Sequence, residues 1–494
     1  MQAFDRLYDK LLQVEKSTDQ SFKEIHVSKN EFEFYWSMLF QHIHRYDEVF
    51  SFIDREGFEH HALLGLELAN MTSQPKLDDQ KLWVGGERFA KIKKPEQSQW
   101  NNFIPQDENS QYFAPLFGLY AYRGKYTIFI QGHFDKRFPS VADFCSYFQD
   151  PSTDQDLVVS QTDLKSSTLK PANHHPSFEE WKRMIETVQK NFTNIPKVVL
   201  ARSSSFTDKN TESYLNHPSS FSYLIDYLYK KNHEHKNFFL FLRPQRGSTF
   251  ISITPEKLFS LNLGQELKLS IDAIAGTRKR DLLDQENDDR LAIELESNEK
   301  ELAEHRFVKN EVIRSLDTIK ASLEDKGIPE TSISMKSVFE EDILKLKHVQ
   351  HLHSLYEMDI ARENSEQINI SELNQLILST LHPTPAVGGQ PKQAAIDLIE
   401  ELESSDRGFY AAPVGIISPD CIQYTVAIRS ALINQNNISV YAGAGIVEGS
   451  DALAEWKETE NKMKNFTEVL ENSMGHAIEV DKKEDHLIET EHNI

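Results

Sequence analysis

The feature that most constrains the fold is a series of short apolar runs joined by turns instead of helices. Between residues 238 and 277 the runs are rich in β-branched and aromatic residues, and they break at 244–247, at Pro255–Glu256 and at Gly264. Parallel neighbours need a crossover of roughly a dozen residues or more, so strands joined this tightly are antiparallel. We predict an antiparallel meander here and a further hairpin about Arg123–Gly124.

Helical patterns separate these groups of strands. Residues 177–192 carry apolar side chains at helical spacing behind Ser177, which is a good N-cap residue. A long helical pattern covers about 284–323, and a last one covers about 452–472. Groups of hairpin strands followed by helices, without regular βαβ units, indicate an α+β fold.

Charge and cysteine content narrow the class of protein. The chain has 494 residues and a formal net charge of −23, which argues against nucleic acid as a partner because phosphates need a basic footprint. Only Cys145 and Cys421 occur, so a disulfide framework is excluded and a reducing cytoplasm is expected. Neither a signal peptide nor an apolar run of roughly 18 residues is present, so no membrane span is expected.

The stretch "IPKVVLARSSSF" places a lysine at the head of an apolar strand. Lys197 shares a face with Val199 and Ala201, because alternate residues of a strand point the same way, whereas Arg202 points to the opposite face. A lysine at the end of a strand ordinarily extends its ammonium group to water along an apolar stem. That is the ordinary interpretation of this stretch taken alone.

Two acidic pairs stand at i,i+3 spacing in the predicted helices. Glu301 and Glu304 face the same way, and Glu304 continues an apolar stripe, where a carboxylate needs a cation or a metal. Glu455 and Glu458 repeat the spacing, although Glu458 and Lys462 also form an i,i+4 pair typical of a solvated face. Together the pairs suit one hard cation, and Mg²⁺ favours a site that it shares with water and an anionic substrate.

Other candidates carry weaker signals. Glu256 stands in a tight turn between strands, where most glutamates are solvated. The glycine turns "AIAGT" and "YAGAGIV" can offer backbone N–H groups to a carboxylate, but tight turning explains them equally well. The histidines of "KHVQHLHS" have no cysteine or HExxH partner nearby, which argues against zinc.

Nine segments in register resemble the chorismate-utilising enzymes, a family that includes isochorismate, anthranilate, aminodeoxychorismate and salicylate synthases. The resemblance is dense from about residue 177 to 470 and only general before that. The segments are "KVVLAR", "TPEKLF", "AIAGT", "EKELAEH", "KHVQHL", "LHPTPAVGGQPK", "DRGFYAAPVG", "VAIRSALI" and "YAGAGIVEGSDALAEWKETENKM". Within the family, Lys197 and Ala386 look like isochorismate synthase, because ammonia-using members carry glutamine and salicylate or anthranilate synthases carry threonine there.

The resemblance implies a reaction in which chorismate loses its C4 hydroxyl while water adds at C2. Water is a poor nucleophile and hydroxide a poor leaving group, so a base and an acid are needed on opposite faces of the ring. Lys197 resembles the base and Glu256 the acid. Lys197 then needs a pKa well below the free value of ~10.4, and Glu256 needs a raised one.

The resemblance also implies the remaining site residues. Glu304 and Glu458 match the Mg²⁺ ligands, with Glu301 and Glu455 as their outer neighbours, and the ion would hold the ring carboxylate. Arg429 and Tyr410 would hold the enolpyruvyl carboxylate, helped by the backbone at Gly443. The substrate-binding positions are Gly276, Thr277, His351, Ala386, Tyr410, Arg429, Gly443 and Lys462. Two departures are Ala412, where the family usually has glycine, and Glu301, which is often aspartate.

Three alternatives remain at this stage. A salicylate synthase would add pyruvate elimination, and Ala386 argues against it. An anthranilate or aminodeoxychorismate synthase would work with a glutaminase, and Lys197 argues against it, so no obligatory glutaminase subunit is expected. A non-catalytic chorismate-binding protein would be expected to lose a charged catalytic group, yet none is missing. Whether the product feeds menaquinone, siderophore or salicylate synthesis stays open.

The resemblance finally implies the domain organisation. A single large α+β unit is expected, with large antiparallel sheets packed together and helices outside. Residues 1–155 would form its weakly matched N-terminal part, and residues 156–472 the chorismate-binding catalytic region. Residues 473–494 form a charged tail that is expected to be disordered.

Overall fold

The computed structural model describes most of the chain, in segments. These are residues 7, 9–13, 22–41, 43, 46–75, 81–90, 98–101, 103–105, 107–131, 170–207, 225, 228–230, 236–346, 349–361 and 368–473. The expected boundary between residues 155 and 156 lies outside them, as do residues 474–494 of the expected tail. Within these segments no helix is both long and apolar enough to cross a membrane.

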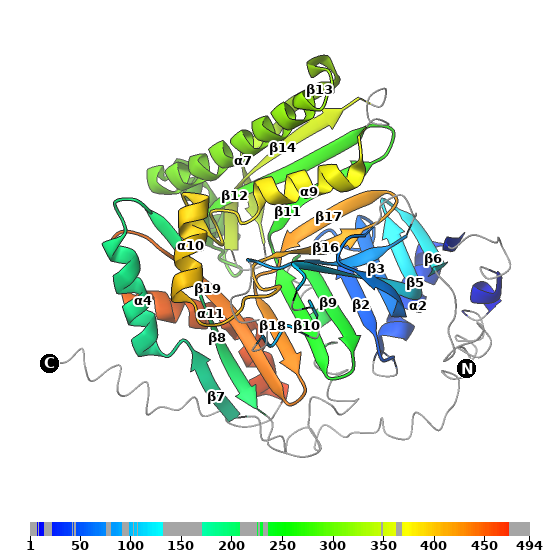
Figure 1. Cartoon of the computed structure of the whole chain (residues 1–494), viewed down its shortest axis with the longest axis horizontal. Helices are drawn as coiled ribbons and strands as arrows, with labels where there is room; N and C mark the ends of the chain where they lie inside the picture. Colours follow the sequence, from blue (N-terminus) through cyan, green and yellow to red (C-terminus); the bar gives the residue numbers. More distant parts are fainter. Residues whose placement is uncertain are drawn as a thin grey trace.

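The 19 strands of the described residues form one hydrogen-bonded network that divides into two antiparallel sheets, in the middle of the molecule in Figure 1. The first sheet runs, in spatial order, through β1 (Phe22–His26), β6 (Lys125–Gln131), β5 (Ser110–Tyr122), β3 (His61–Thr72), β2 (Val49–Ile53), β9 (Phe238–Gln245), β10 (Ser248–Thr254), β18 (Ser430–Asn434), β19 (Asn437–Ile446), β8 (Lys197–Thr207) and β7 (Lys170–His175). The short β15 (Gly389–Gln390) pairs with the beginning of β8.

The second sheet is joined to the first through β5, whose first residues pair with β4. It runs through β13 (Ile333–Lys345), β14 (Val349–Ile360), β12 (Leu267–Lys279), β11 (Lys257–Leu263), β17 (Cys421–Val426), β16 (Pro413–Ile417) and β4 (Trp83–Glu87). Every strand pair in both sheets is antiparallel, as the hairpin turns of the sequence predicted.

The chain crosses between the sheets at two neighbouring points. β10 ends in the first sheet at Thr254, and β11 begins in the second sheet at Lys257, so these two strands do not pair. The predicted meander is therefore wrong at Pro255–Glu256, because a turn signal marks where a strand ends and not which strand it pairs with. β17 and β18 make the second crossing, and Ile253 N–H donates across to the carbonyl of Arg429 at 3.0 Å.

The first sheet is apolar on both faces, which explains the unbroken run "FFLFL" in β9. Leu240 and Leu242 pack into the core between the sheets, whereas Phe239 and Phe241 pack on the opposite side. There the aromatic residues of α2 (Lys29–Gln41) cover them. Burial of an alternating strand on both faces places this sheet at the centre of the molecule.

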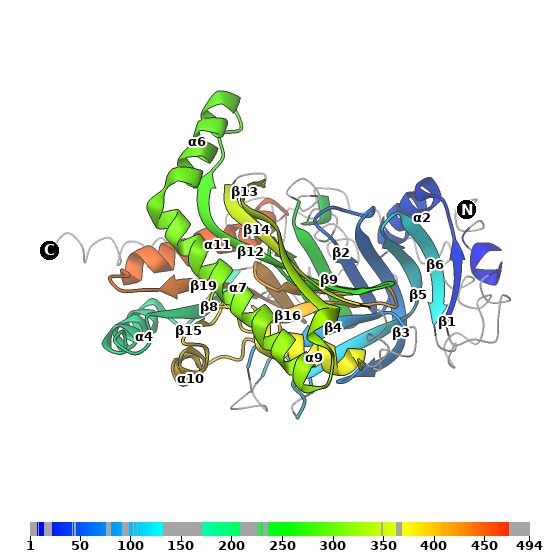
Figure 2. The ribbon, with the colours of Figure 1, turned by 90° about the horizontal axis from the view of Figure 1, so that it is seen from above.

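Helices cover the outer faces. They are α4 (Phe178–Lys190), α6 (Gln285–Ser297), α7 (Glu299–Asp325), α9 (Ile370–Leu381), α10 (Lys392–Leu402) and α11 (Ala452–Ser473), with the short 3₁₀ turn η6 (Glu330–Ser332). In Figure 2, α7 lies along the second sheet and α6 projects from the body. The predicted fold class is confirmed: large antiparallel sheets packed together, with helices outside.

Several local predictions are confirmed. Ser177 caps α4 in a full capping box with Glu180, and the helix buries its apolar stripe. Arg123 and Gly124 both have positive φ, at 47° and 75°, as the tight hairpin between β5 and β6 requires. The final helix lies where it was expected.

The long helix predicted over 284–323 is instead two helices. Asn298 is extended, with φ −81° and ψ 108°, and its side chain accepts from Glu301 N–H to cap α7. Short polar side chains compete with helical hydrogen bonding in this way, which the apolar periodicity did not reveal. The break re-aims the chain so that α7 begins beside β12.

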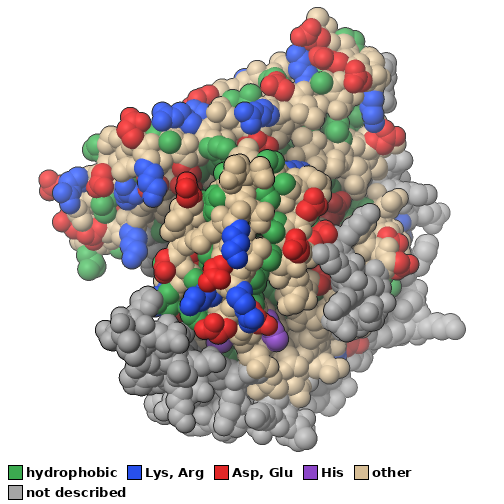
Figure 3. Space-filling view, turned by 60° about the vertical axis from the view of Figure 1, so that its left-hand side comes forward, with side chains coloured by type: hydrophobic (Ala, Val, Ile, Leu, Met, Phe, Trp, Pro, Cys, Tyr) green, Lys and Arg blue, Asp and Glu red, His purple; other side chains and the backbone are tan. Residues whose placement is uncertain are grey.

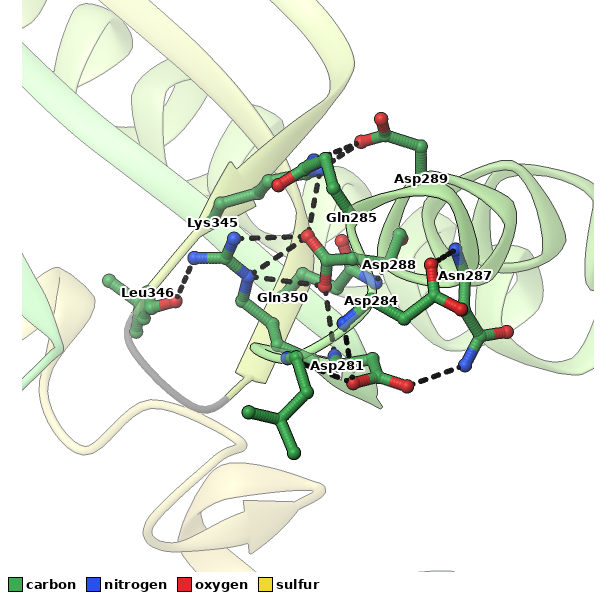
Figure 4. A network of polar contacts seen from close by, with 11 residues as sticks. Asp281, Asp284, Gln285, Asn287, Asp288, Asp289, Lys345, Leu346 and Gln350 are labelled. Carbon is green, nitrogen blue, oxygen red and sulfur yellow. Dashed lines mark hydrogen bonds and ion pairs between the residues drawn. The ribbon is translucent and has the colours of Figure 1, made fainter.

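A buried carboxylate fastens α6 to the second sheet (Figure 4). The fully buried side chain of Asp288 accepts from Arg280 at 3.0 Å and pairs with Lys345 at 3.1 Å. Hydrogen bonds from Arg280 are the main cause of the lowered pKa of Asp288. Arg280 also donates to the carbonyl of Leu346 at 2.9 Å. These contacts fix the start of the α6–α7 segment relative to the end of β12.

The surface around α4 and α10 carries both charge signs. On the face in Figure 3, acidic and basic side chains are interspersed, and no continuous basic area appears over the described residues of that face. A nucleic-acid surface would need such an area.

Candidate active site

Lys197 lies at the first position of β8, where the strand enters the sheet beside β15. Burial lowers the pKa of its ammonium, and the carboxylates of Glu304 and Glu256 partly offset that effect. The Lys462 ammonium lowers the pKa further. A β-carbon placed on Gly445 would lie 3.4 Å from Lys197 Cε, so the lysine stem runs across that glycine of β19. The lysine is therefore held among charges and does not simply extend to water.

The predicted alternation along β8 is confirmed. Arg202 points to the other face, where its guanidinium stacks on the Trp456 ring at 3.6 Å from the centroid. Its Nε donates to the Thr459 hydroxyl of α11 at 2.5 Å. Lys197 therefore lies on the face of β8 opposite Arg202 and α11.

Glu256 lies at the first crossing between the sheets. Its carbonyl accepts from Val426 N–H at 3.0 Å, and its own N–H donates to the Thr254 hydroxyl at 3.2 Å. Burial raises the pKa of its carboxyl to about 7, against the opposing effects of Lys197 and Arg429. A carboxyl with this pKa is half protonated at neutral pH, which its position in a turn did not suggest.

Arg429 lies at the second crossing, next to the first. Its φ of 48° is in the left-handed region, which is uncommon for a residue with a side chain and costs about 1 kcal/mol. Burial lowers the pKa of its guanidinium, and Glu256 opposes the shift. The two crossings thus bring a carboxyl and a guanidinium together from positions far apart in the sequence.

A bulge in β12 forms the next part of the site. The register with β14 shifts between Ala275 and Thr277, and Gly276 occupies the bulge with φ +77°. A β-carbon there would lie 3.3 Å from Glu301 Cβ, so the position needs glycine for both conformation and space. Thr277 N–H donates to Glu301 at 3.0 Å, and its hydroxyl contacts His351 Nδ1 at 3.0 Å.

His351 connects this bulge with the crossings. Burial lowers the pKa of its imidazole to about 4, the Gly276 backbone opposes the shift, and Arg429 adds to it. The imidazole is therefore neutral at physiological pH. A neutral imidazole beside a guanidinium can hydrogen-bond to the same anionic ligand as the guanidinium without adding a second positive charge.

Tyr410 and Gly443 form the side of the site nearest β19. Tyr410 is buried and stacks on Tyr441 with ring centroids 5.3 Å apart, and burial raises the pKa of its phenol. A β-carbon on Gly443 would lie 2.9 Å from the Tyr410 hydroxyl. The Gly443 carbonyl accepts from Lys462 Nζ at 2.8 Å.

The four predicted metal-site carboxylates differ in their contacts. Glu301 is the most engaged, because Arg278 also donates to it at 2.8 Å. Glu455 accepts from the Ser450 hydroxyl at 2.8 Å, and burial raises its pKa, with Glu458 adding to the shift. Glu458, half exposed, pairs with Lys462 at 2.6 Å.

Glu304 on α7 is exposed. Among the described residues it has no hydrogen-bond or ion-pair partner. Glu304 and Lys462 both act electrostatically on Lys197, so α7 and α11 approach each other at that lysine. No group of three His, Cys, Asp or Glu side chains close enough for a metal occurs within the described ranges. The donors are nevertheless hard oxygens on two helices, with one exposed carboxylate from each, which fits an ion that keeps most of its waters.

Ala386 is exposed in a turn closed by Val387 and Gly388 N–H donating to the Thr384 carbonyl. Gly388 in turn accepts from Val199 N–H at 2.8 Å, which ties the turn to β8. Ala412 is fully buried in the core.

Sequence reasoning missed one further group near the site. Arg407, within "DRGFYAAPVG", is buried and pairs with Glu403. Its place in that shared segment was the available signal, but its role depends on contacts with β8 that the sequence does not display.

The antiparallel two-sheet fold, with acidic and basic groups brought together at its sheet crossings, is the arrangement to compare with known protein families. The family model described as "Chorismate binding enzyme" matches residues 20–471. The chain therefore belongs to the chorismate-binding enzyme family.

Curated relatives agree with this membership. The chain is 33% identical over 314 residues to the chloroplastic isochorismate synthase of Catharanthus roseus, covering 62% of this chain and 48% of the relative. It is 32% identical over 295 residues to isochorismate synthase MenF of Bacillus subtilis, covering 59% of this chain and 55% of the relative. It is 35% identical over 215 residues to anthranilate synthase component 1 of Saccharolobus solfataricus, covering 43% and 46%. The aligned parts thus span about half the length of these relatives.

Solved structures show the same fold. The menaquinone-specific isochorismate synthase MenF of Escherichia coli matches with a TM-score of 0.69 at 20% identity, over 95% of this chain and 100% of that one. Anthranilate synthase component I of Streptococcus pneumoniae matches with a TM-score of 0.55 at 20% identity, over 92% and 93%.

Proposed function

We propose that the chain is an isochorismate synthase, an isomerase that converts chorismate to isochorismate. The observation that carries the proposal is the pair of opposed pKa shifts, lowered for Lys197 and raised to about 7 for Glu256, in groups that act on each other electrostatically. Such opposed shifts mark a base and an acid that work at one pH. The curated relatives named isochorismate synthase support the same reaction.

In the proposed reaction, neutral Lys197 removes a proton from water as the oxygen bonds to C2 of the ring. Both ring double bonds shift, C1=C2 to C1=C6 and C5=C6 to C4=C5, and the C4–O bond breaks with its electron pair going to the departing oxygen. Glu256 gives that oxygen its proton, so water leaves. One water enters and one leaves, which makes the change an isomerisation, and the proton returns from Lys197 to Glu256 afterwards.

Substrate binding in the proposal divides between the two ends of the site. Arg429 offers a planar fork that matches the enolpyruvyl carboxylate, and Tyr410 adds its buried hydroxyl. Thr277 and the Gly276 bulge hold the other side, where the ring carboxylate approaches α7, and the neutral His351 lies between them and Arg429. Both carboxylates of the substrate thereby meet donors in an otherwise acidic protein.

Mg²⁺ is the proposed cofactor. Glu304 and Glu458 would hold it, with Glu301 and Glu455 as outer neighbours, and when bound it neutralises the ring carboxylate beside these acidic side chains. Glu301 is already oriented by Thr277 N–H and Arg278, as an outer residue would be.

Product analysis with chorismate and Mg²⁺ tests the proposal. Isochorismate as the main product near neutral pH, with at most traces of salicylate, is expected from Lys197 and Ala386. Salicylate as the dominant product would make the chain a salicylate synthase, and anthranilate formed with ammonia would make it an anthranilate synthase component. Tight binding of chorismate without any product would make it a non-catalytic binding protein.

A further inference from the structure

The edge of β8 has a gap in its strand pairing, next to the proposed base. β15 pairs only with Lys197 and Val198, and β7 pairs only from Ser203 onward. Backbone N–H and carbonyl groups of residues 199–202 lie between the two paired segments and face this edge, and buried backbone groups need hydrogen-bond partners. Val199 N–H is satisfied by the Gly388 carbonyl, but within the described residues the Val199 carbonyl and the Ala201 N–H have no neighbouring strand.

A buried ion pair takes the place of the missing strand. Arg407 Nη2 donates to the Val199 carbonyl at 2.7 Å, and Ala201 N–H donates to Glu403 Oε1 at 2.8 Å. The two side chains are joined at both oxygens, through Nε to Oε2 at 2.8 Å and Nη2 to Oε1 at 2.5 Å. Their side chains are 5% and 6% exposed, so solvent competes little for these bonds.

The same arginine reaches two further parts of the site. Its Nη1 donates to the carbonyl of Val387, the residue after Ala386, at 2.9 Å. Its backbone carbonyl accepts from Tyr410 N–H at 2.8 Å. The guanidinium also lies over the Phe89 ring, with its central carbon 4.1 Å from the ring centroid. Arg407 therefore touches the strand of the base, the turn of Ala386 and the residue proposed to bind a carboxylate.

We propose that Arg407 and Glu403 act as a positioning unit, which sets the placement of Lys197 and of the Ala386 turn against the bound substrate. The inference rests on the proposed function, because it assigns the pair to the isomerisation step. A buried ion pair by itself adds little to stability compared with apolar residues, so its value here is in geometry. A planar fork that uses four donors in fixed directions suits that purpose, and a lysine cannot replace it.

The test compares Arg407→Lys with Arg243→Lys. Arg243 is also buried and donates to two backbone carbonyls, of Ile43 and Tyr46, but it lies at the end of β9 away from the crossings. Both variants are expected to lose some thermal stability. Only Arg407→Lys is expected to lose kcat, by about 10- to 100-fold, since small misplacements of catalytic groups have effects of this size. Its KM for chorismate should stay within about threefold, because Arg429 is untouched.

Product choice and a second variant complete the test. A larger fraction of products other than isochorismate is expected from Arg407→Lys, since the Ala386 turn loses its donor. Glu403→Gln is the second variant, and it replaces Arg407→Lys in the test if that variant does not fold. It keeps an acceptor for Ala201 N–H, so a smaller loss of kcat is expected. Equal losses of kcat in Arg407→Lys and Arg243→Lys, or unchanged kcat in folded Arg407→Lys and Glu403→Gln, would overturn the inference.

A nuclear magnetic resonance titration separates this inference from the proposed function. The Nζ signal of Lys197, identified by its loss in Lys197→Gln, reports the placement of that side chain without any turnover. In Arg407→Lys its pKa should rise toward the ordinary lysine value, while in Arg243→Lys it should match the wild type. If the wild type does not convert chorismate, the proposed function fails, and an unchanged Lys197 titration in Arg407→Lys would separately refute the positioning unit.

Discussion

The protonation state of Glu256 gives the most direct test of the proposed chemistry. Its carboxyl has a pKa of about 7, against 4.5 for an ordinary glutamate, because burial disfavours the charged form. A shift of this size corresponds to about 3 kcal/mol, as an upper value since solvent reaches part of the side chain. Glu256→Gln keeps the size and polarity of the side chain and removes the proton.

The sign of the effect on stability follows from proton linkage. Because the folded-state pKa is raised, the folded protein binds this proton more tightly than the unfolded chain does. The stability it contributes is complete below pH 4.5 and is lost as the pH rises through about 7. Glu256→Gln has no such proton to lose. The free energy of unfolding of the variant should therefore rise relative to that of the wild type between pH 4.5 and 8, by up to ~3 kcal/mol.

The kinetic consequence has the same origin. An acid with a pKa of about 7 supplies its proton below that pH, so wild-type turnover should fall about tenfold per pH unit on the alkaline side. Glu256→Gln should lose about 10²–10⁴-fold in kcat below pH 7, and this deficit should shrink at higher pH, where the wild type loses the same proton. Turnover by product chromatography and difference infrared spectra of the protonated carboxyl, wild type minus variant, measure the two effects.

A glutamate whose pKa is shifted in the opposite direction serves as the control. Hydrogen bonds from Ser177 lower the pKa of Glu180, so Glu180→Gln should lose stability relative to the wild type at higher pH instead of gaining it. An infrared titration of Glu256 near pH 4.5, or a Glu256→Gln variant with wild-type turnover, would refute the assignment of this residue as the acid.

Three further predictions test the rest of the site. Lys197→Gln should lose about 10²–10⁴-fold in turnover while still binding chorismate. Wild-type turnover should fall as the pH drops below the lowered pKa of Lys197. A variant that turns over normally would return the lysine to a strand-end role. Chelation should abolish turnover and Mg²⁺ should restore it, and Glu304→Gln should raise the Mg²⁺ concentration needed far more than Glu311→Gln on the same helix; full activity in excess chelator would contradict the metal site. Gly443→Ala should raise the KM for chorismate, because its methyl would lie 2.9 Å from the Tyr410 hydroxyl, and an unchanged KM would exclude that contact from binding.

Local patterns predicted the elements of the fold better than their partners. The cap at Ser177 and the turn at Arg123–Gly124 depend on side chains and φ angles within a few residues, so the sequence contains the whole cause. Which strands pair depends on burial over the entire chain. For that reason the strand end at Pro255–Glu256 was found, but the crossing to another sheet was not.

The candidate site shows the same division. The i,i+3 spacing was enough to place Glu301 and Glu304 on one side of a helix, and Thr277 N–H does meet one of them. The environment of Lys197 was not accessible from its own strand, because every group that shifts its pKa comes from elsewhere in the chain. The resemblance supplied those residues, and the physical basis of their proposed roles appears only in three dimensions.

The two sheet crossings explain why this fold suits acid–base chemistry. At a crossing the backbone leaves one sheet before it joins the next, yet at Glu256 its hydrogen bonds are satisfied: the carbonyl accepts from Val426 N–H, and the N–H donates to the Thr254 hydroxyl. Among the described residues the carboxyl of Glu256 has no hydrogen-bond or ion-pair partner, so burial between the two sheets can raise its pKa. Arg429, at the adjacent crossing, supplies the cation that the proposed function assigns to a substrate carboxylate. Its guanidinium is not close enough to hold Glu256 ionised, since burial remains the dominant effect on that pKa. A dianionic substrate that engages Arg429 would weaken the cation's pull on Glu256 and keep the acid protonated until the C4–O bond breaks.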